Sequence, residues 1–204
     1  ASTLRPQVTP INLIFALHPL MCGRLSSVEC GDSVGDMVRL AIAHNIGIYT
    51  AHTNFDQAAN GTADVLAQLL NLQAVSPVEA TAPDTDPARG YGRVGDLPTA
   101  QPLKSRLLHS PTTNLQHSVR RVAVLGGSGA GYLSAVAKTG AQVYLTADCK
   151  FHQFQESRDR GIVLVDAGHY PTERPACDRL VEWLVAQGVE WAQLSQHDED
   201  FRQF

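Results

Sequence analysis

The chain has 204 residues, of which 44% are hydrophobic and 18% charged, an ordinary globular composition that excludes wholesale disorder. Its 16 basic and 20 acidic residues give a net charge of −4, which leaves no basic excess for a nucleic-acid backbone. The longest apolar run, residues 11–17, is too short to span a bilayer. The four cysteines form no CxxC pair, so we expect reduced thiols in a cytoplasmic protein. From the apolar runs and the net charge we expect no membrane or nucleic acid as a partner.

The first lobe, residues 11–72, is predicted to contain two strands and two helices. In chain order these are a strand at 11–17, a helix capped by Ser33, a strand at 46–51 and a helix capped by Thr62. Both helices carry apolar residues at helical spacing, and we expect these to face a core: Val34, Met37, Val38, Ala41 and Ile42 in the first, Val65, Leu66, Leu69 and Leu70 in the second.

The middle of the chain, residues 73–118, is rich in proline, serine, threonine and alanine. We interpret it as a linker with one short helix at 103–108. Inside it, residues 90–95 contain three glycines and indicate a strand or a turn.

The second lobe, residues 119–204, alternates strands with helices. The predicted strands are 122–125, 142–146 and 162–166, and the helices are 132–138, 151–158 and 175–187, the last with Leu180, Trp183 and Leu184 facing inward. This alternation favours an α/β fold in which a mostly parallel sheet is covered by helices.

Residues 166–173, Asp-Ala-Gly-His-Tyr-Pro-Thr-Glu, lie where a strand ends and a helix begins. His169 and Glu173 can converge beyond the strand end, and their nitrogen and oxygen donors suit Zn, Fe(II) or Mn. Equally, Glu173 can simply complement the positive end of the helix while His169 is a surface turn residue.

Two further strand ends carry the same residue types. His18 follows the strand at 11–17, and His52 and Asp56 follow the strand at 46–51. Several such ends gathered from distant parts of a chain are typical of a metal site, whose carboxylates can bridge two cations.

The glycine turn, residues 126–131, follows a strand and precedes a helix, so its N–H groups can face an anion. Its spacing matches neither the dinucleotide nor the P-loop pattern, and a tight connection is the simpler interpretation. Beside a metal site, Gly127, Ser128 and Gly129 become candidates for binding a substrate phosphate.

A fourth strand end carries Asp148 and His152. We interpret Asp148 as a helix cap. His152 can be a surface residue or can act on the same cavity as a general acid or base.

Six stretches together resemble the NIF3 family of dinuclear metal centre proteins, whose members are also called GTP cyclohydrolase 1 type 2. In chain order they are residues 17–20, 49–56, 90–96, 122–129, 146–152 and 166–173. Their order and spacing agree with the family from about residue 11 to the end of the chain.

The resemblance implies a NIF3-like α/β fold with two lobes sharing a metal cleft, and a homohexamer. It also implies one or two divalent cations (Zn, Fe or Mn) per chain, held by four residues carried over from the family motifs: His18, Asp56, His169 and Glu173. His52, His152 and the glycine turn would line the pocket.

The chain departs from the family pattern at its first ligand motif, because Leu17 stands where the family has the first histidine of His-His-Pro. Leucine cannot coordinate a metal, so one of the two sites is expected to be weakened or empty. Ala147 replaces a usual glycine, a milder change. We also expect the family's segment preceding the first strand to be missing here, through truncation, processing or degeneration.

Two functions from different classes follow. The first is a metal-dependent hydrolase of the GTP cyclohydrolase 1 type 2 kind, acting on a nucleotide or another phosphorylated small molecule, with His152 or His52 moving protons. The alternative is a non-catalytic oligomeric scaffold or partner-binding protein with a degenerate metal site, favoured by Leu17. A third interpretation is a nucleotide-binding domain that uses the glycine turn.

Overall fold

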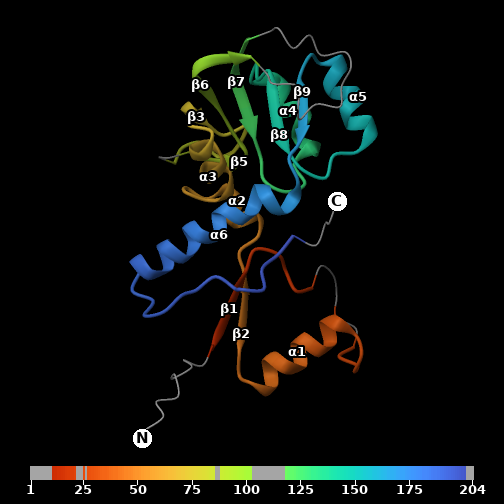
Figure 1. Ribbon diagram of the computed structural model, residues 1–204, viewed down its shortest axis with the longest axis vertical. Helices are drawn as coiled ribbons and strands as arrows, with labels where there is room; N and C mark the ends of the chain where they lie inside the picture. The colour runs from red at the N-terminus through yellow and green to blue at the C-terminus, as the bar shows by residue number, and fades with distance from the viewer. Residues whose placement is uncertain (1–10, 22–24, 26, 86–87, 103–117, 201–204) are drawn as a thin grey trace, which may run out of the picture. The chain divides into compact units, whose positions relative to one another are not determined.

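The computed structural model describes residues 11–21, 25, 27–85, 88–102 and 118–200. The chain divides into two compact units, residues 1–54 and 55–204. Each is described separately below, with the labels of Figure 1.

The first unit contains strands β1 (Leu13–Ala16) and β2 (Gly47–Thr50) and helix α1 (Ser33–Ala43). The two strands pair in parallel, with Ala16 opposite Thr50, so their carboxyl ends meet at one edge. Asp32, not the predicted Ser33, caps α1 by accepting a hydrogen bond from the amide of Gly35. The expected apolar stripe of this helix is only partly covered, since Met37 and Ile42 are exposed.

The second unit is built on a five-stranded sheet with the order β3-β6-β7-β8-β9. These strands are Gln73–Ser76, Arg93–Pro102, Ser118–Val124, Val143–Thr146 and Val163–Asp166. A separate pair is formed by β4 (Glu79–Ala82) and β5 (Arg89–Tyr91). The helices are α3 (Thr62–Leu69), α4 (Leu133–Lys138), α5 (Phe151–Asp159) and α6 (His169–Ala186), while the short α2 (Thr53–Gln57) crosses the boundary between the units.

Both faces of this sheet are buried, because its central strands alternate their side chains between two apolar clusters. Ala123 and Tyr144 face the cluster that includes Leu133 and Val136 of α4. Val122, Val124 and Val143 face the other, which includes residues of α3. Figure 1 shows α5 beside β9 in this unit, and α3 also packs against α6. The fold is therefore α/β, as predicted.

The sheet is mixed rather than mostly parallel. Strands β7, β8 and β9 pair in parallel, whereas β3 pairs with β6, and β6 with β7, in antiparallel fashion. Strands β3 to β6 come from the segment interpreted as a linker, residues 73–118. The glycine-rich stretch 90–95 covers the end of β5, the turn at Gly92 and the start of β6. The short helix expected at 103–108 falls outside the described residues.

The helices of the second unit differ from expectation at single residues. Gly61 occupies the N-cap position of α3 and Thr62 is buried, so Thr62 does not cap that helix. Leu69 and Trp183, both expected in the core, are 64% and 54% exposed, whereas Leu180 is buried as predicted. Among the described helices, none is long and apolar enough to cross a membrane.

Candidate metal centre

Helix α6 brings His169 and Glu173 together. His169 is the first residue of the helix and Glu173 follows one turn later, so both side chains lie on the same face. Nε2 of His169 lies 3.1 Å from Oε1 of Glu173, and the side chains are 27% and 15% exposed. Their proximity is observed, and their role as metal ligands stays a prediction.

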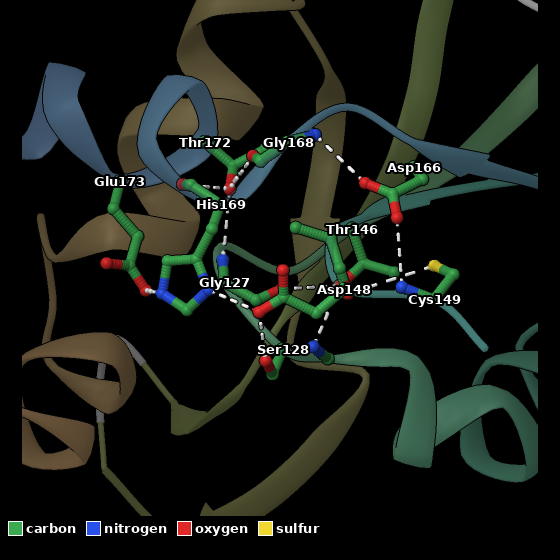
Figure 2. A network of polar contacts seen from close by, with 12 residues as sticks. Gly127, Ser128, Thr146, Asp148, Cys149, Asp166, Gly168, His169, Thr172 and Glu173 are labelled. Atoms are coloured by element: carbon green, nitrogen blue, oxygen red, sulfur yellow. Dashed lines mark hydrogen bonds and ion pairs between the residues drawn. The ribbon is translucent and has the colours of Figure 1, made fainter. Parts of the chain in front are cut away.

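Asp148 contacts the opposite side of the imidazole ring, as Figure 2 shows. Nδ1 of His169 lies 2.5 Å from Oδ2 of Asp148. The hydroxyl of Ser128 donates to the same oxygen at 2.5 Å. A carboxylate has only acceptors, so a hydrogen bond between these two groups takes its proton from Nδ1 of His169.

Asp148 therefore does not cap helix α5, contrary to the sequence-based expectation. The helix begins at Phe151 with Lys150 as its N-cap, and the amide of Lys150 donates to Oε1 of Gln153. Asp148 instead has a φ of +53°, a left-handed conformation that aspartate tolerates better than most residues. This backbone geometry accompanies the contacts of its carboxylate with Ser128 and His169.

Asp166, the last residue of β9, joins the two loops that carry these groups. Its Oδ2 accepts a hydrogen bond from the amide of Cys149 at 2.9 Å. Its Oδ1 accepts one from the amide of Gly168 at 3.1 Å. Cys149 follows Asp148 and Gly168 precedes His169, so one carboxylate ties together the loops on both sides of the imidazole contact.

Two buried threonines hold the glycine turn. Oγ1 of Thr172 accepts a hydrogen bond from the amide of Gly127 at 3.0 Å. Oγ1 of Thr146 accepts one from the amide of Gly129 at 2.9 Å and donates to the carbonyl of Gly127 at 3.0 Å. These two amides have partners within the chain, so they lend no support to the phosphate site predicted at Gly127, Ser128 and Gly129, which stays a prediction.

Gly127 lies directly against the candidate ligand atoms. Its φ of +63° is a conformation that glycine adopts without steric cost. A Cβ atom built there would overlap Oε1 of Glu173 and lie 3.1 Å from Nε2 of His169. Only glycine leaves this space open beside the imidazole and the carboxylate.

The thiol nearest this network is not activated. Burial raises the pKa of Cys149 to about 12, and the charges of Asp166 and Asp148 add to the effect. The thiolate is the form that binds metals and attacks electrophiles. Burial and the two carboxylates thus disfavour the thiolate form of Cys149.

In the first unit, the strand-end histidines lie side by side. His18 follows β1 and His52 follows β2, and their ring centroids are 5.5 Å apart. Both side chains are exposed, whereas Leu17 is half-buried. The parallel pairing of β1 and β2 accounts for this meeting, since each histidine stands two residues beyond the paired Ala16 and Thr50.

The remaining predicted residues lie in the second unit. Asp56 is half-buried in α2, and its charge is one of several causes that raise the pKa of Tyr132, after burial, Tyr91 and Glu79. His152 is exposed on the first turn of α5. The assignment of His18 and Asp56 as metal ligands, and of His52 and His152 as proton carriers, stays a prediction.

The residues around α6 fit a divalent cation. Imidazole nitrogen with carboxylate oxygen is a donor pair that Zn²⁺, Fe²⁺ and Mn²⁺ accept. Both donors lie against the backbone of Gly127, and the second ring nitrogen contacts a carboxylate, as is common for metal-binding histidines.

Comparison with known proteins identifies the family. The family model described as Duf34/NIF3 (NGG1p interacting factor 3) matches residues 8–199. The chain belongs to the DUF34/NIF3 family. This confirms the resemblance drawn from the six sequence stretches.

Several relatives in the DUF34/NIF3 family are called GTP cyclohydrolase 1 type 2 homolog. The one from a Nostoc species is 58% identical, and the match covers 95% of this chain and 76% of that protein. The Streptomyces coelicolor protein is 34% identical, and the match covers 82% of this chain and 63% of that protein. The Streptococcus pneumoniae protein is 33% identical, with 78% and 59% covered. The chain thus spans less than two thirds of the last two relatives.

Solved structures of NIF3-related proteins share the fold. A Bacillus cereus protein related to NIF3 aligns with a TM-score of 0.78 at 22% identity, covering 95% of this chain and 83% of that one. A Staphylococcus aureus protein aligns with a TM-score of 0.77 at 21% identity, covering 95% and 80%. At these identities the likeness shows the fold alone.

Sequence reasoning missed the residues that support the candidate site. Asp148 was interpreted as a cap, and Asp166, Thr146 and Thr172 received no role. One signal was available in the sequence. Asp148 follows strand β8 and Asp166 ends strand β9, and these two strands are neighbours that pair in parallel. Such ends meet at one sheet edge.

Proposed function

We propose that this protein is a metal-dependent hydrolase whose cation is held by His169 and Glu173. The observation that carries the proposal is the 3.1 Å approach of Nε2 of His169 to Oε1 of Glu173 above the space left by Gly127. The family resemblance adds His18 and Asp56 to the ligand set.

A divalent cation at this position supplies a Lewis acid that polarises a substrate oxygen and lowers the pKa of water. The chain's own groups orient the metal ligand and carry protons. Asp148 orients the His169 ring, and the exposed imidazoles of His152 and His52 are the proposed proton carriers.

The proposed substrate is a nucleotide or another phosphorylated small molecule. The support comes from relatives called GTP cyclohydrolase 1 type 2 homolog, and from the position of the glycine turn next to the His169–Glu173 pair. The amide of Ser128, at the exposed tip of this turn, is the group we assign to a substrate phosphate.

Metal content tests the proposal. The protein, purified in metal-replete medium, is analysed for Zn, Fe and Mn by inductively coupled plasma mass spectrometry. We expect bound metal in the parent chain and a loss of at least half in His169→Ala and Glu173→Gln. His197→Ala is the matched control, because His197 is an exposed histidine of the same unit outside the proposed site. Metal at background in the parent chain, or equal content in all variants, would contradict the proposal.

One observation favours a second function, a non-catalytic oligomeric scaffold. Leu17 replaces a ligand of the family motif, which weakens the case for a complete dinuclear site. Leu17→His discriminates between the two: an active hydrolase with a weakened second site gains metal and GTP-hydrolysing rate, whereas a scaffold gains neither.

We also propose that the chain associates with copies of itself, as a hexamer by family resemblance. The support is the number of large apolar side chains exposed in the first unit, including Ile14 at 44%, Leu40 at 59% and Ile42 at 75%. Large exposed apolar patches mark protein–protein contacts, so we assign these side chains to the surface between copies.

A further inference from the structure

We infer that Asp148 is the positioning residue of the candidate metal centre, fixing the His169 ring as an Nδ1–H donor so that Nε2 is the atom offered to a cation. The inference rests on the proposed function for the presence of a cation. The contacts that position the ring are all formed by residues of this chain.

The two nitrogens of the His169 ring lie at different distances from their carboxylate partners. Nδ1 approaches Asp148 at 2.5 Å, whereas Nε2 approaches Glu173 at 3.1 Å. Both partners are carboxylates, so both compete for the single proton of a neutral imidazole. The shorter contact favours the proton on Nδ1, and Nε2 then keeps the lone pair that a cation needs.

Hydrogen bonds from neighbouring loops hold Asp148 in place. Ser128 donates to the carboxylate oxygen that contacts His169. The neighbouring amide of Cys149 donates to Asp166, whose other oxygen binds the amide of Gly168, next to His169. Figure 2 shows these groups from the β7–α4, β8–α5 and β9–α6 connections converging on the ring. The orientation of one imidazole is thus held by contacts from three connections of the sheet.

The backbone of Asp148 also differs from that of an ordinary helix cap. Asp148 has a φ of +53°, which costs energy for a residue with a Cβ atom and persists where the surroundings impose it. A structural cap would not require it, and α5 has its N-cap two residues later. The conformation accompanies the contacts of the carboxylate with Ser128 and His169.

Asp148→Gly and Asp148→Asn test the inference. Glycine removes the carboxylate and accepts the positive φ, so the backbone is not strained. Asparagine also tolerates this conformation and keeps an oxygen that can accept the Nδ1 proton. Asp159→Asn is the matched control, because it removes one negative charge from an aspartate whose side chain is 73% exposed and paired with Arg158.

The first measurement is ¹⁵N NMR of the metal-free protein, with the His169 signals assigned through His169→Gln, at a pH where the ring is neutral. We expect the Nδ1–H tautomer in the parent chain, Asp148→Asn and Asp159→Asn, and the Nε2–H tautomer in Asp148→Gly. A proton on Nε2 in the parent chain, or a tautomer that Asp148→Gly leaves unchanged, would overturn the inference.

The second measurement is the affinity for Zn²⁺, by competition with a chromogenic chelator. Loss of such an outer contact typically weakens metal binding by about 10–100-fold. We expect a loss in this range for Asp148→Gly, a smaller one for Asp148→Asn and none for Asp159→Asn. If the parent chain binds no metal, the proposed function fails while the tautomer still tests the positioning role. If it binds metal and Asp148→Gly binds equally well, the positioning role fails while the proposed function stands.

Discussion

A missing Cβ atom at Gly127 creates the space in which the candidate ligand atoms lie. The backbone of the turn is held by Thr172 and Thr146 from either side, so it cannot withdraw to admit a larger residue. His169 and Glu173 therefore owe their accessible donor atoms to a residue that contributes no side chain.

Gly127→Ala is expected to impair metal binding and stability together. The new methyl group overlaps Oε1 of Glu173, and the positive φ adds about 1–3 kcal/mol of strain. Thermal unfolding and Zn²⁺ titration measure both effects.

Gly131→Ala is the matched control in the same turn, because a Cβ atom there meets nothing within 4 Å and its φ is not in the left-handed region. The explanation from space would be wrong if both variants lost metal affinity to the same extent.

At the scale of elements, Arg93 links α3 to the β5–β6 turn. Its side chain is 4% exposed and forms an ion pair with Asp64 of α3. It also donates to the carbonyl oxygens of Gly90 and Gly92, each at 2.8 Å. A buried charge with this many partners specifies how the turn packs against the helix.

Arg93→Met is expected to reduce the free energy of unfolding by about 3–5 kcal/mol, because it leaves the carboxylate of Asp64 without its cationic partner. Chemical denaturation measures the change. Arg158→Met, which removes an exposed pair with Asp159 at 3.7 Å, is expected to change it by less than about 1 kcal/mol. Equal effects of the two substitutions would contradict the role given to Arg93.

Strands with runs of apolar residues were elements that the sequence could predict. Their apolar runs placed β7, β8 and β9 within a few residues of their observed bounds, and α4 and α5 followed from helical spacing. In contrast, β3 to β6 are short or interrupted by prolines at 98 and 102, and β6 shifts register between Asp96 and Gln101. Strands of this kind carry no run of apolar residues, so composition alone suggested a linker.

Ligand residue types at strand ends could be singled out from the sequence, whereas the loop residues that contact them could not. His169 and Glu173 were found because their residue types suit metals. Asp148 was misassigned because a polar residue before a helix usually caps it, and no local pattern reveals that its partner lies 21 residues away.

At the scale of the whole molecule, the proposed self-association is tested by the mass of the protein in solution. We expect light scattering coupled to size-exclusion chromatography to give a mass that is a multiple of 22.0 kDa, six-fold by family resemblance. Leu40→Lys with Ile42→Lys is expected to lower this mass, whereas Phe151→Lys, at an exposed aromatic residue of the second unit, serves as the comparison. A monomeric parent chain would contradict the proposed self-association.

The most direct test of the central claim is an anomalous difference map at the zinc edge, from crystals of the full chain grown with Zn²⁺. The account predicts a peak about 2.0–2.2 Å from both Nε2 of His169 and an oxygen of Glu173. The same map shows whether His18 and Asp56 complete the coordination sphere. A map without a peak at His169 and Glu173, or with zinc bound only elsewhere, would contradict the account.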